Sequence, residues 1–107
     1  MSYKIIFSNH FNNTIKYLIK KYPSLKNDIL SLISSLKINP IQGIALGKNM
    51  YIIRLSIGSK GKGKSGGARV LTLVKVEEMT VLLFAIYDKS IKDTLSTKEI
   101  QELINNT

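Results

Sequence analysis

Apolar residues near the start of the chain form a short run and then follow a helical spacing. The run Tyr3–Ser8 predicts a short strand. The apolar positions after it recur every three or four residues, which predicts a helix with one buried face; they are Phe11, Ile15, Leu18, Ile19 and Tyr22. Pro23 ends this helix, because proline disrupts a helix interior.

A second helix is predicted directly after Pro23. Ser24 is a residue type that caps helix N-termini, and Asn39-Pro40 ends the helical pattern. One apolar stripe lies between them, at Leu25, Ile29, Leu32, Ile33 and Leu36. Two consecutive amphipathic helices predict an αα-hairpin whose apolar faces belong to the core.

The pattern changes after the second helix. We expect a loop over Ile41–Asn49, followed by three runs rich in Ile, Leu and Val. These runs predict the strands Met50–Ile57, Ala68–Val76 and Thr80–Tyr87, with a tight hairpin at Glu77-Glu78-Met79 between the last two.

Ser96 and Glu99 have the spacing of a capping box, which predicts a final helix carrying Ile100, Leu103 and Ile104. The predicted order is therefore β-α-α-β-β-β-α. We expect a single α+β domain over residues 1–107, with a mainly antiparallel sheet and the N-terminal helical hairpin packed on one face.

Strand geometry predicts where the polar side chains of the sheet gather. Alternation directs Tyr51, Ile53, Leu55 and Ile57 toward the helices and Ile52, Arg54 and Ser56 away from them. Consecutive antiparallel strands run in opposite directions. The loop after Met50–Ile57 and the C-terminal end of Thr80–Tyr87 therefore lie at the same end of the sheet. We expect one patch there, comprising this loop and Arg54, Arg69, Tyr87, Asp88 and Lys89.

Composition narrows the classes of function. The chain has no cysteine and one histidine, His10, so disulfides, cysteine-based metal sites, His-rich zinc sites and a His-based triad are excluded. We therefore expect no metal and no cofactor. No secretory signal fits the N-terminus, and no apolar run approaches the roughly 18 residues of a membrane helix. A soluble cytoplasmic protein without membrane contact is the expectation.

Charge points to an anionic partner. The formal net charge is +9, and no carboxylate occurs between Asp28 and Glu77. A block of one sign costs stability through self-repulsion, so this block favours a surface for RNA, DNA or an acidic protein. Beside Arg54 and Arg69, the candidate RNA-binding or rRNA-binding residues are Lys48, Lys60, Lys62, Lys64 and Lys75.

The glycine-rich loop matches the literal phosphate-binding pattern G-x-x-x-x-G-K-[ST] over Gly58–Ser65. A nucleotide-binding loop of that class is followed at once by a helix, whose N-terminus binds the phosphates. Here Gly66-Gly67 and a β-rich run follow, so we expect no nucleotide cofactor. The glycines of this loop, from Gly58 to Gly67, predict a flexible segment that becomes ordered when a partner binds.

The available side chains suit RNA cleavage by the substrate's own 2′-hydroxyl. Clustered cations stabilise the charged phosphorane, and they lower one another's pKa values, which makes a lysine a usable base. Arginine grips phosphoryl oxygens with two hydrogen bonds. Tyr87 can stack on a base or donate a proton.

Three segments carry a family resemblance: Tyr51-Ile-Ile-Arg-Leu-Ser, the basic loop with Gly67-Ala-Arg-Val-Leu-Thr, and Leu83-Phe-Ala-Ile-Tyr-Asp-Lys. They resemble the RelE/ParE superfamily of bacterial toxins, above all its HigB-like branch, and the likeness extends over essentially the whole chain. The resemblance implies the toxin of a type II toxin–antitoxin system. Such a toxin is a metal-independent endoribonuclease that cleaves mRNA on the 70S ribosome, and a cognate antitoxin, here expected to carry a helix-turn-helix domain, holds it in check.

The resemblance also implies roles for individual residues. Arg69 matches the arginine that contacts the scissile phosphate, and Arg54 matches a basic catalytic strand position. The chain departs from RelE at Ile52, near Ser90 and near Thr94 or Leu95, where RelE has further basic residues and a stacking tyrosine. The resemblance to HigB-type toxins, in which acidic and aromatic residues take over those functions, implies that Tyr87, Asp88 and Lys89 replace them in this chain.

Two other functions fit the same sequence. One is a ParE-type poison of DNA gyrase that does not cleave RNA. The other is a non-catalytic module that binds nucleic acid in a salt-sensitive manner. DNA breaks with intact mRNA, or RNA binding without cleavage, would distinguish them from an endoribonuclease.

Overall fold

The computed structural model describes residues 2–61, 66–91 and 95–105. Its elements are β1 (Lys4–Phe7), α1 (Asn9–Lys21), α2 (Leu25–Ile38), β2 (Ile44–Gly47), β3 (Met50–Leu55), the 3-10 turn η1 (Gly58–Lys60), β4 (Ala68–Lys75), β5 (Thr80–Asp88) and α3 (Thr97–Asn105). The α+β class is confirmed, and so is the predicted order of helices and strands apart from one added strand, β2.

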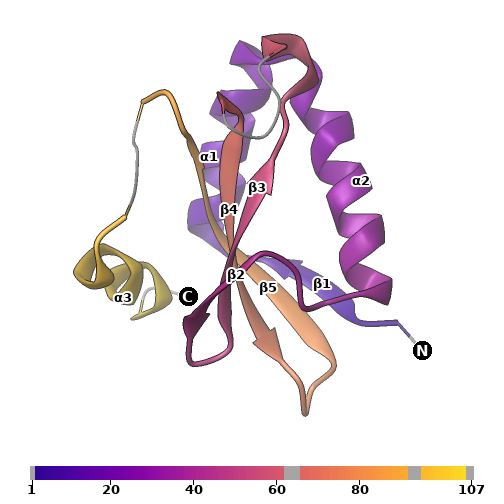
Figure 1. Cartoon of the computed structure of the whole chain (residues 1–107), viewed down its shortest axis with the longest axis vertical. Helices are drawn as coiled ribbons and strands as arrows, with labels where there is room; N and C mark the ends of the chain where they lie inside the picture. The colour runs from indigo at the N-terminus through magenta and orange to yellow at the C-terminus, as the bar shows by residue number, and fades with distance from the viewer. Residues whose placement is uncertain (1, 62–65, 92–94, 106–107) are drawn as a thin grey trace.

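One five-stranded sheet forms the centre of the molecule, with the strand order β1-β5-β4-β3-β2 (Figure 1). The pairs β3–β4 and β4–β5 are antiparallel, as predicted, and the tight turn at Glu77-Glu78-Met79 joins β4 to β5. The pair β2–β3 is also antiparallel. β1 pairs in parallel with β5, beyond the helical hairpin. This connection places the first strand beside the last one.

The prediction of a loop over Ile41–Asn49 is wrong for Ile44–Gly47, which forms the edge strand β2. All four of its residues are exposed, so this strand has no buried face that an apolar–polar alternation in the sequence would mark. The turn to β3 depends on backbone geometry instead: Lys48 and Asn49 have φ values of 54° and 64°. Two consecutive left-handed residues are typical of the tightest β-hairpins.

The sheet separates two apolar layers. On one face, α1 and α2 cover a cluster that includes Phe11, Leu36 and Val70, with Ile53 and Ile57 pointing into it as the alternation predicted. On the other face, α3 packs Ile100, Leu103 and Ile104 against a smaller cluster. Its buried residues are Leu71, Leu82, Phe84 and Ala85. Phe84 and Ala85 share this face because a register shift interrupts the β4–β5 ladder beside them.

Two of the helix starts are capped by side chains. Ser8 accepts a hydrogen bond from the Phe11 amide at 3.1 Å, and the predicted capping box is confirmed by reciprocal 3.1 Å bonds between Ser96 and Glu99. Ser24 is the N-cap residue of α2, as predicted, but its hydroxyl makes no capping bond to the backbone of the helix. That hydroxyl is held by partners described below.

Within the described part of the chain, none of the helices is long and apolar enough to cross a membrane.

Candidate functional site at the loop end of the sheet

Three predicted site residues stand side by side in one row across the sheet. Arg69 of β4 is the register partner of Arg54 on β3 and of Tyr87 on β5. Residues directly opposite one another point to the same face, so all three side chains lie on the face away from α1 and α2. The predicted convergence of these three residues is confirmed, and we call them the arginine row.

Exposure differs within the arginine row. Arg54 is exposed, Tyr87 is half-buried, and Arg69 is only 6% exposed. One guanidinium nitrogen of Arg69, Nη1, donates to the carbonyl oxygen of Ala68 at 3.1 Å. The pairing of Arg54 with Arg69 gathers positive charge on this face of the sheet.

A glycine allows β3 and β4 to approach closely just before this row. A Cβ atom on Gly67 would lie 2.0 Å from the carbonyl oxygen of Leu55, which is closer than any side chain can come. The carbonyl of Gly67 accepts a hydrogen bond from the Lys89 amide at 3.0 Å. Gly67 thus holds the start of β4 between β3 and the segment that follows β5.

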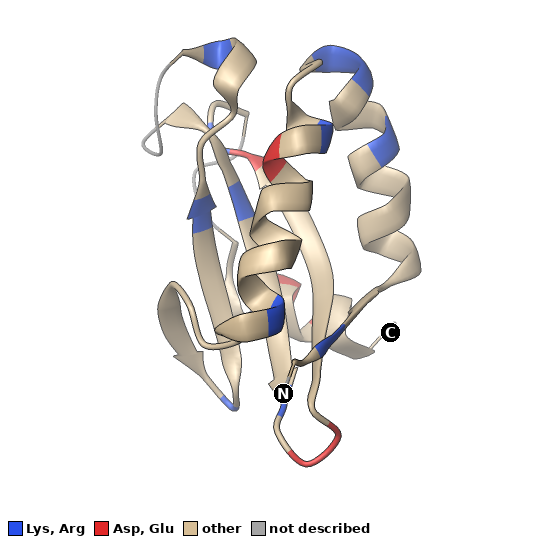
Figure 2. Ribbon diagram, turned by 90° about the vertical axis from the view of Figure 1, so that its right-hand side faces the viewer, with Lys and Arg blue, Asp and Glu red and all other residues tan. Residues whose placement is uncertain are grey.

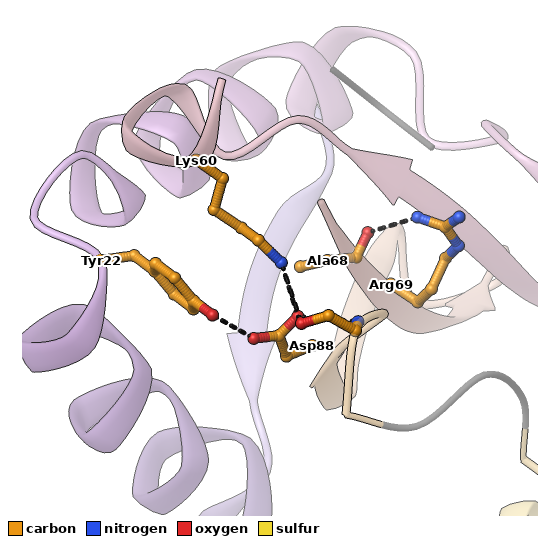
Figure 3. Close-up of polar contacts among 6 residues, drawn as sticks. Tyr22, Lys60, Ala68, Arg69 and Asp88 are labelled. Atoms are coloured by element: carbon orange, nitrogen blue, oxygen red, sulfur yellow. Dashed lines mark hydrogen bonds and ion pairs between the residues drawn. The ribbon is translucent and has the colours of Figure 1, made fainter. Parts of the chain in front are cut away.

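Asp88 lies in the neighbouring row and points to the opposite face. Its register partner is Ala68, and both are buried, Asp88 with 3% of its surface exposed. Figure 3 shows Lys60 reaching down to this carboxylate, with Nζ 2.8 Å from Oδ1. The side chains of this ion pair are 8% and 1% exposed. Asp88 was predicted to join the patch that contains the arginine row, and the structure places it behind that row instead.

Further groups complete the surroundings of the carboxylate. Tyr22, which follows α1, donates its hydroxyl to Oδ2, while the amide and hydroxyl of Ser90 donate to Oδ1 at 3.0 and 2.7 Å. The ammonium of Lys60 also lies 5.2 Å from the centre of the Tyr22 ring, within the range of a cation–π contact. We call Tyr22, Lys60, Asp88 and Ser90 the clamp.

Opposing effects act on the pKa of Asp88. Burial raises it, but hydrogen bonds from Lys60, Tyr22 and Ser90 favour the charged form and together hold the pKa far below the usual range of a carboxyl group. Asp88 therefore remains ionised under all physiological conditions. A carboxylate whose oxygens accept this many hydrogen bonds is a weak base.

The start of the glycine-rich loop is anchored a second time, to the α1–α2 turn. The Ser24 hydroxyl accepts from the Ser59 amide at 2.8 Å and donates to Asp28 at 2.9 Å, and Asp28 also accepts from the Gly58 amide at 3.1 Å. The stem of the loop that was predicted to be flexible, Gly58–Lys60, therefore has hydrogen bonds to the start of α2. Lys62 and Lys64, at the centre of that prediction, lie outside the described residues.

The remaining predicted residues lie in different places. Lys89 follows β5 directly and stays beside the arginine row. Lys75 ends β4, and Lys48 lies in the turn before β3, so both belong to the opposite end of the sheet and do not join the row. Figure 2 shows basic segments at the upper end of the molecule from both the helices and the strands, while acidic residues mark the hairpin at the lower end.

The strand predicted after the glycine-rich loop is confirmed as β4. The nucleotide-binding interpretation thus lacks the helix that it requires. Among the described residues, no group of three or more His, Asp or Glu side chains is placed to hold a metal ion.

Several residues of the clamp and of the second anchor of the loop were not recognised from the sequence. Tyr22 was assigned to the core, and Ser24, Asp28 and Ser59 were given no polar role in the site. Tyr22 and Asp88 are 66 positions apart, and Ser24 and Ser59 are 35 apart. No local spacing or motif connects such pairs, so a single sequence carries no signal for them.

Comparison with known proteins agrees with this architecture. No protein-family model and no curated protein sequence matches the chain. Among solved structures, it is similar to an arginine-to-alanine double mutant of the E. coli toxin RelE in the free state. The TM-score is 0.66, over 98% of this chain and 97% of that one. The fold is RelE-like. At 15% sequence identity, the likeness establishes the RelE-like fold and leaves the chemistry to this chain's own residues.

The RelE-like sheet presents two different polar groups at its loop end. The arginine row can bind a phosphodiester, since arginine offers paired donors to phosphoryl oxygens and tyrosine offers a stacking surface or a proton. The clamp is already satisfied internally. The two groups are therefore suited to different tasks.

Proposed function

We propose that this protein is the toxin of a type II toxin–antitoxin system and that it stops translation by cleaving mRNA on the 70S ribosome. The observation that carries the proposal is the arginine row at the loop end of a RelE-like sheet. A net charge of +9 supports an RNA partner, because lysines and arginines neutralise phosphates and release counterions.

The proposed reaction uses a nucleophile that the RNA supplies. The 2′-oxygen attacks the adjacent phosphorus, the bond from phosphorus to the 5′-oxygen breaks, and a 2′,3′-cyclic phosphate remains. Arg54 and Arg69 stabilise the negative charge that develops on the phosphoryl oxygens. Lys89 is the candidate that accepts the proton of the attacking 2′-hydroxyl, and Tyr87 is the candidate that protonates the leaving 5′-oxygen or stacks on a neighbouring base.

Arg69 reaches the phosphate only if its surroundings open, because only 6% of its surface is exposed in the free protein. Arg54, which is exposed, is the first contact for the RNA backbone. A requirement for rearrangement is consistent with the proposed dependence on the ribosome, which would hold the mRNA against the row. A cognate antitoxin would bind the toxin when it is not active.

The test is inducible expression with mapping of mRNA ends. We expect translation to stop and mRNA to be cut within codons, with 2′,3′-cyclic phosphate at the new ends. Arg69→Ala should lower the cleavage rate about 100-fold or more, the usual cost of losing one transition-state donor. Lys37→Ala, which removes an exposed lysine at the far end of α2, serves as the control.

Two outcomes would overturn the proposal. DNA breaks with intact mRNA would indicate a gyrase poison on the same fold. Salt-sensitive RNA binding without cleavage, even on ribosomes, would indicate a binding module. Full cleavage by the Arg69→Ala variant would refute the assigned site while leaving the RelE-like fold unaffected.

A further inference from the structure

The clamp joins three segments that are far apart in the sequence. Tyr22 comes from the α1–α2 turn, Lys60 from the end of η1, and Asp88 from the last position of β5 (Figure 3). Their polar atoms meet on one carboxylate, whose two oxygens accept hydrogen bonds from Lys60, Ser90 and Tyr22. Such a junction fixes the stem of the basic loop relative to the sheet.

The clamp lies one residue away from the arginine row on two strands. Asp88 follows Tyr87 on β5, and its register partner Ala68 precedes Arg69 on β4. The carbonyl of Ala68 accepts the hydrogen bond from the Arg69 guanidinium. A shift of Asp88 would therefore move both Tyr87 and the carbonyl that orients Arg69.

The clamp carboxylate lies on the opposite face of the sheet from the arginine row. The side chains of Lys60 and Asp88 are 8% and 1% exposed, and each already has the other as its ionic partner. The ammonium of Lys60 is engaged by Asp88 and Ser90, at 2.8 and 3.2 Å, and lies over the Tyr22 ring. Removing one partner of such a pair leaves the other charge buried and uncompensated.

We propose that Lys60 and Asp88 are positioning residues: their buried ion pair holds the loop stem against the end of β5 and so sets Arg69 and Tyr87 for the phosphate, while neither side chain touches the RNA. This inference rests on the proposed function, because it assigns roles in RNA cleavage. It replaces the sequence-based assignments of Lys60 to RNA binding and of Asp88 to catalysis.

The experiment compares Lys60→Met, Asp88→Asn and the double variant for cleavage per folded molecule. We expect each single variant to cleave RNA at least about 10-fold more slowly than wild type. If both side chains act through one contact, the second substitution removes nothing further, so the cleavage rate of the double variant should lie within about 3-fold of the rate of the slower single variant. Independent contacts would give losses that multiply. Multiplied losses, or full activity in folded single variants, would overturn the proposal.

The salt dependence of RNA binding separates positioning from phosphate contact. The logarithm of the binding constant falls linearly with the logarithm of the salt concentration, and losing one phosphate contact makes this slope shallower by about 0.7 for single strands. We expect an unchanged slope for Lys60→Met and a reduced slope for Arg54→Met, with Lys37→Met as the matched control lysine. A slope reduced by Lys60→Met as much as by Arg54→Met would show that Lys60 binds phosphate.

A third readout does not depend on RNA. The Lys89 amide donates to the Gly67 carbonyl beside the clamp, whereas the Lys4 amide donates to Met79 at the other end of the sheet. In Lys60→Met we expect hydrogen exchange at Lys89 to accelerate at least about 10-fold while exchange at Lys4 is unchanged. Tyr22→Phe, which keeps the ring, should show a smaller change of the same kind even if Lys60→Met does not fold. Equal exchange at Lys89 in wild type and Tyr22→Phe would refute the clamp, whether or not the protein cleaves RNA.

Discussion

The two faces of the sheet handle charge in opposite ways at the same end of the molecule. The arginine row places two cations opposite each other on neighbouring strands, whereas the clamp surrounds one carboxylate with a cation and hydroxyl donors. Only one row of the β-ladder separates them. The first arrangement gathers positive charge and suits an anionic ligand, while the carboxylate of the second already has an ion pair and hydrogen bonds.

The contrast places two neighbouring residues of one strand in different surroundings. Asp88 is adjacent to Tyr87 in sequence, but the strand alternation directs it to the buried face, where it binds Lys60. Sequence proximity therefore groups residues whose physical roles differ. Substitutions on the two faces should affect different properties.

The largest difference in stability is expected between Asp88→Ala and Arg54→Ala. Loss of the carboxylate leaves the Lys60 ammonium buried without its partner, which typically costs about 3–5 kcal/mol of unfolding free energy. Arg54 is exposed, and its removal should change the unfolding free energy by less than about 0.5 kcal/mol. Urea denaturation measures both. Equal losses in the two variants would contradict the division between the faces.

Substitutions at two glycines test how closely the backbone packs at the loop end of the sheet. A Cβ on Gly67 meets the Leu55 carbonyl at 2.0 Å, so Gly67→Ala must push β4 away from β3 and should cost about 1–3 kcal/mol. A Cβ on Gly58, in the loop stem, meets the Ser24 hydroxyl oxygen at 3.3 Å, and a smaller loss is expected there. Thermal unfolding of both variants decides the order, and a larger loss for Gly58→Ala would contradict it.

The clamp should also give the stability a specific dependence on pH. The pKa of Asp88 is lower in the folded protein than in the unfolded chain, where it is about 3.9. Its contribution is therefore complete above that value and is lost as the pH falls below it, with a slope of at most about 1.4 kcal/mol per pH unit. Asp88→Asn should lack this acid-dependent loss. Parallel acid profiles of wild type and Asp88→Asn would rule the effect out.

A modest effect is expected at α3, which packs on the face of the arginine row. Ser96→Ala removes the cap bond to the Glu99 amide and should lower the unfolding free energy by about 1 kcal/mol. Because the clamp is on the other face, the acid-dependent loss should keep its wild-type size. A flattened acid profile in Ser96→Ala would mean that the two faces are coupled.

Much of the fold was predictable because it depends on local patterns. Helical spacing gave α1 and α2, the capping box gave the start of α3, and apolar runs gave β3, β4 and β5. The strand β2 was missed because Ile44–Gly47 is exposed throughout and so has no alternation. Its formation depends on the left-handed turn at Lys48 and Asn49 and on pairing with β3.

The arginine row could be predicted from strand geometry alone. A side-chain period of two and short connections between consecutive antiparallel strands fix which residues face one another, so Arg54, Arg69 and Tyr87 could be placed together in advance. The surroundings of the basic loop depend on tertiary packing. Lys60 and Asp88 are 28 positions apart, and Tyr22 lies on a different layer from both. Their meeting depends on how the helical hairpin packs on the sheet, and local periodicity carries no information about that contact.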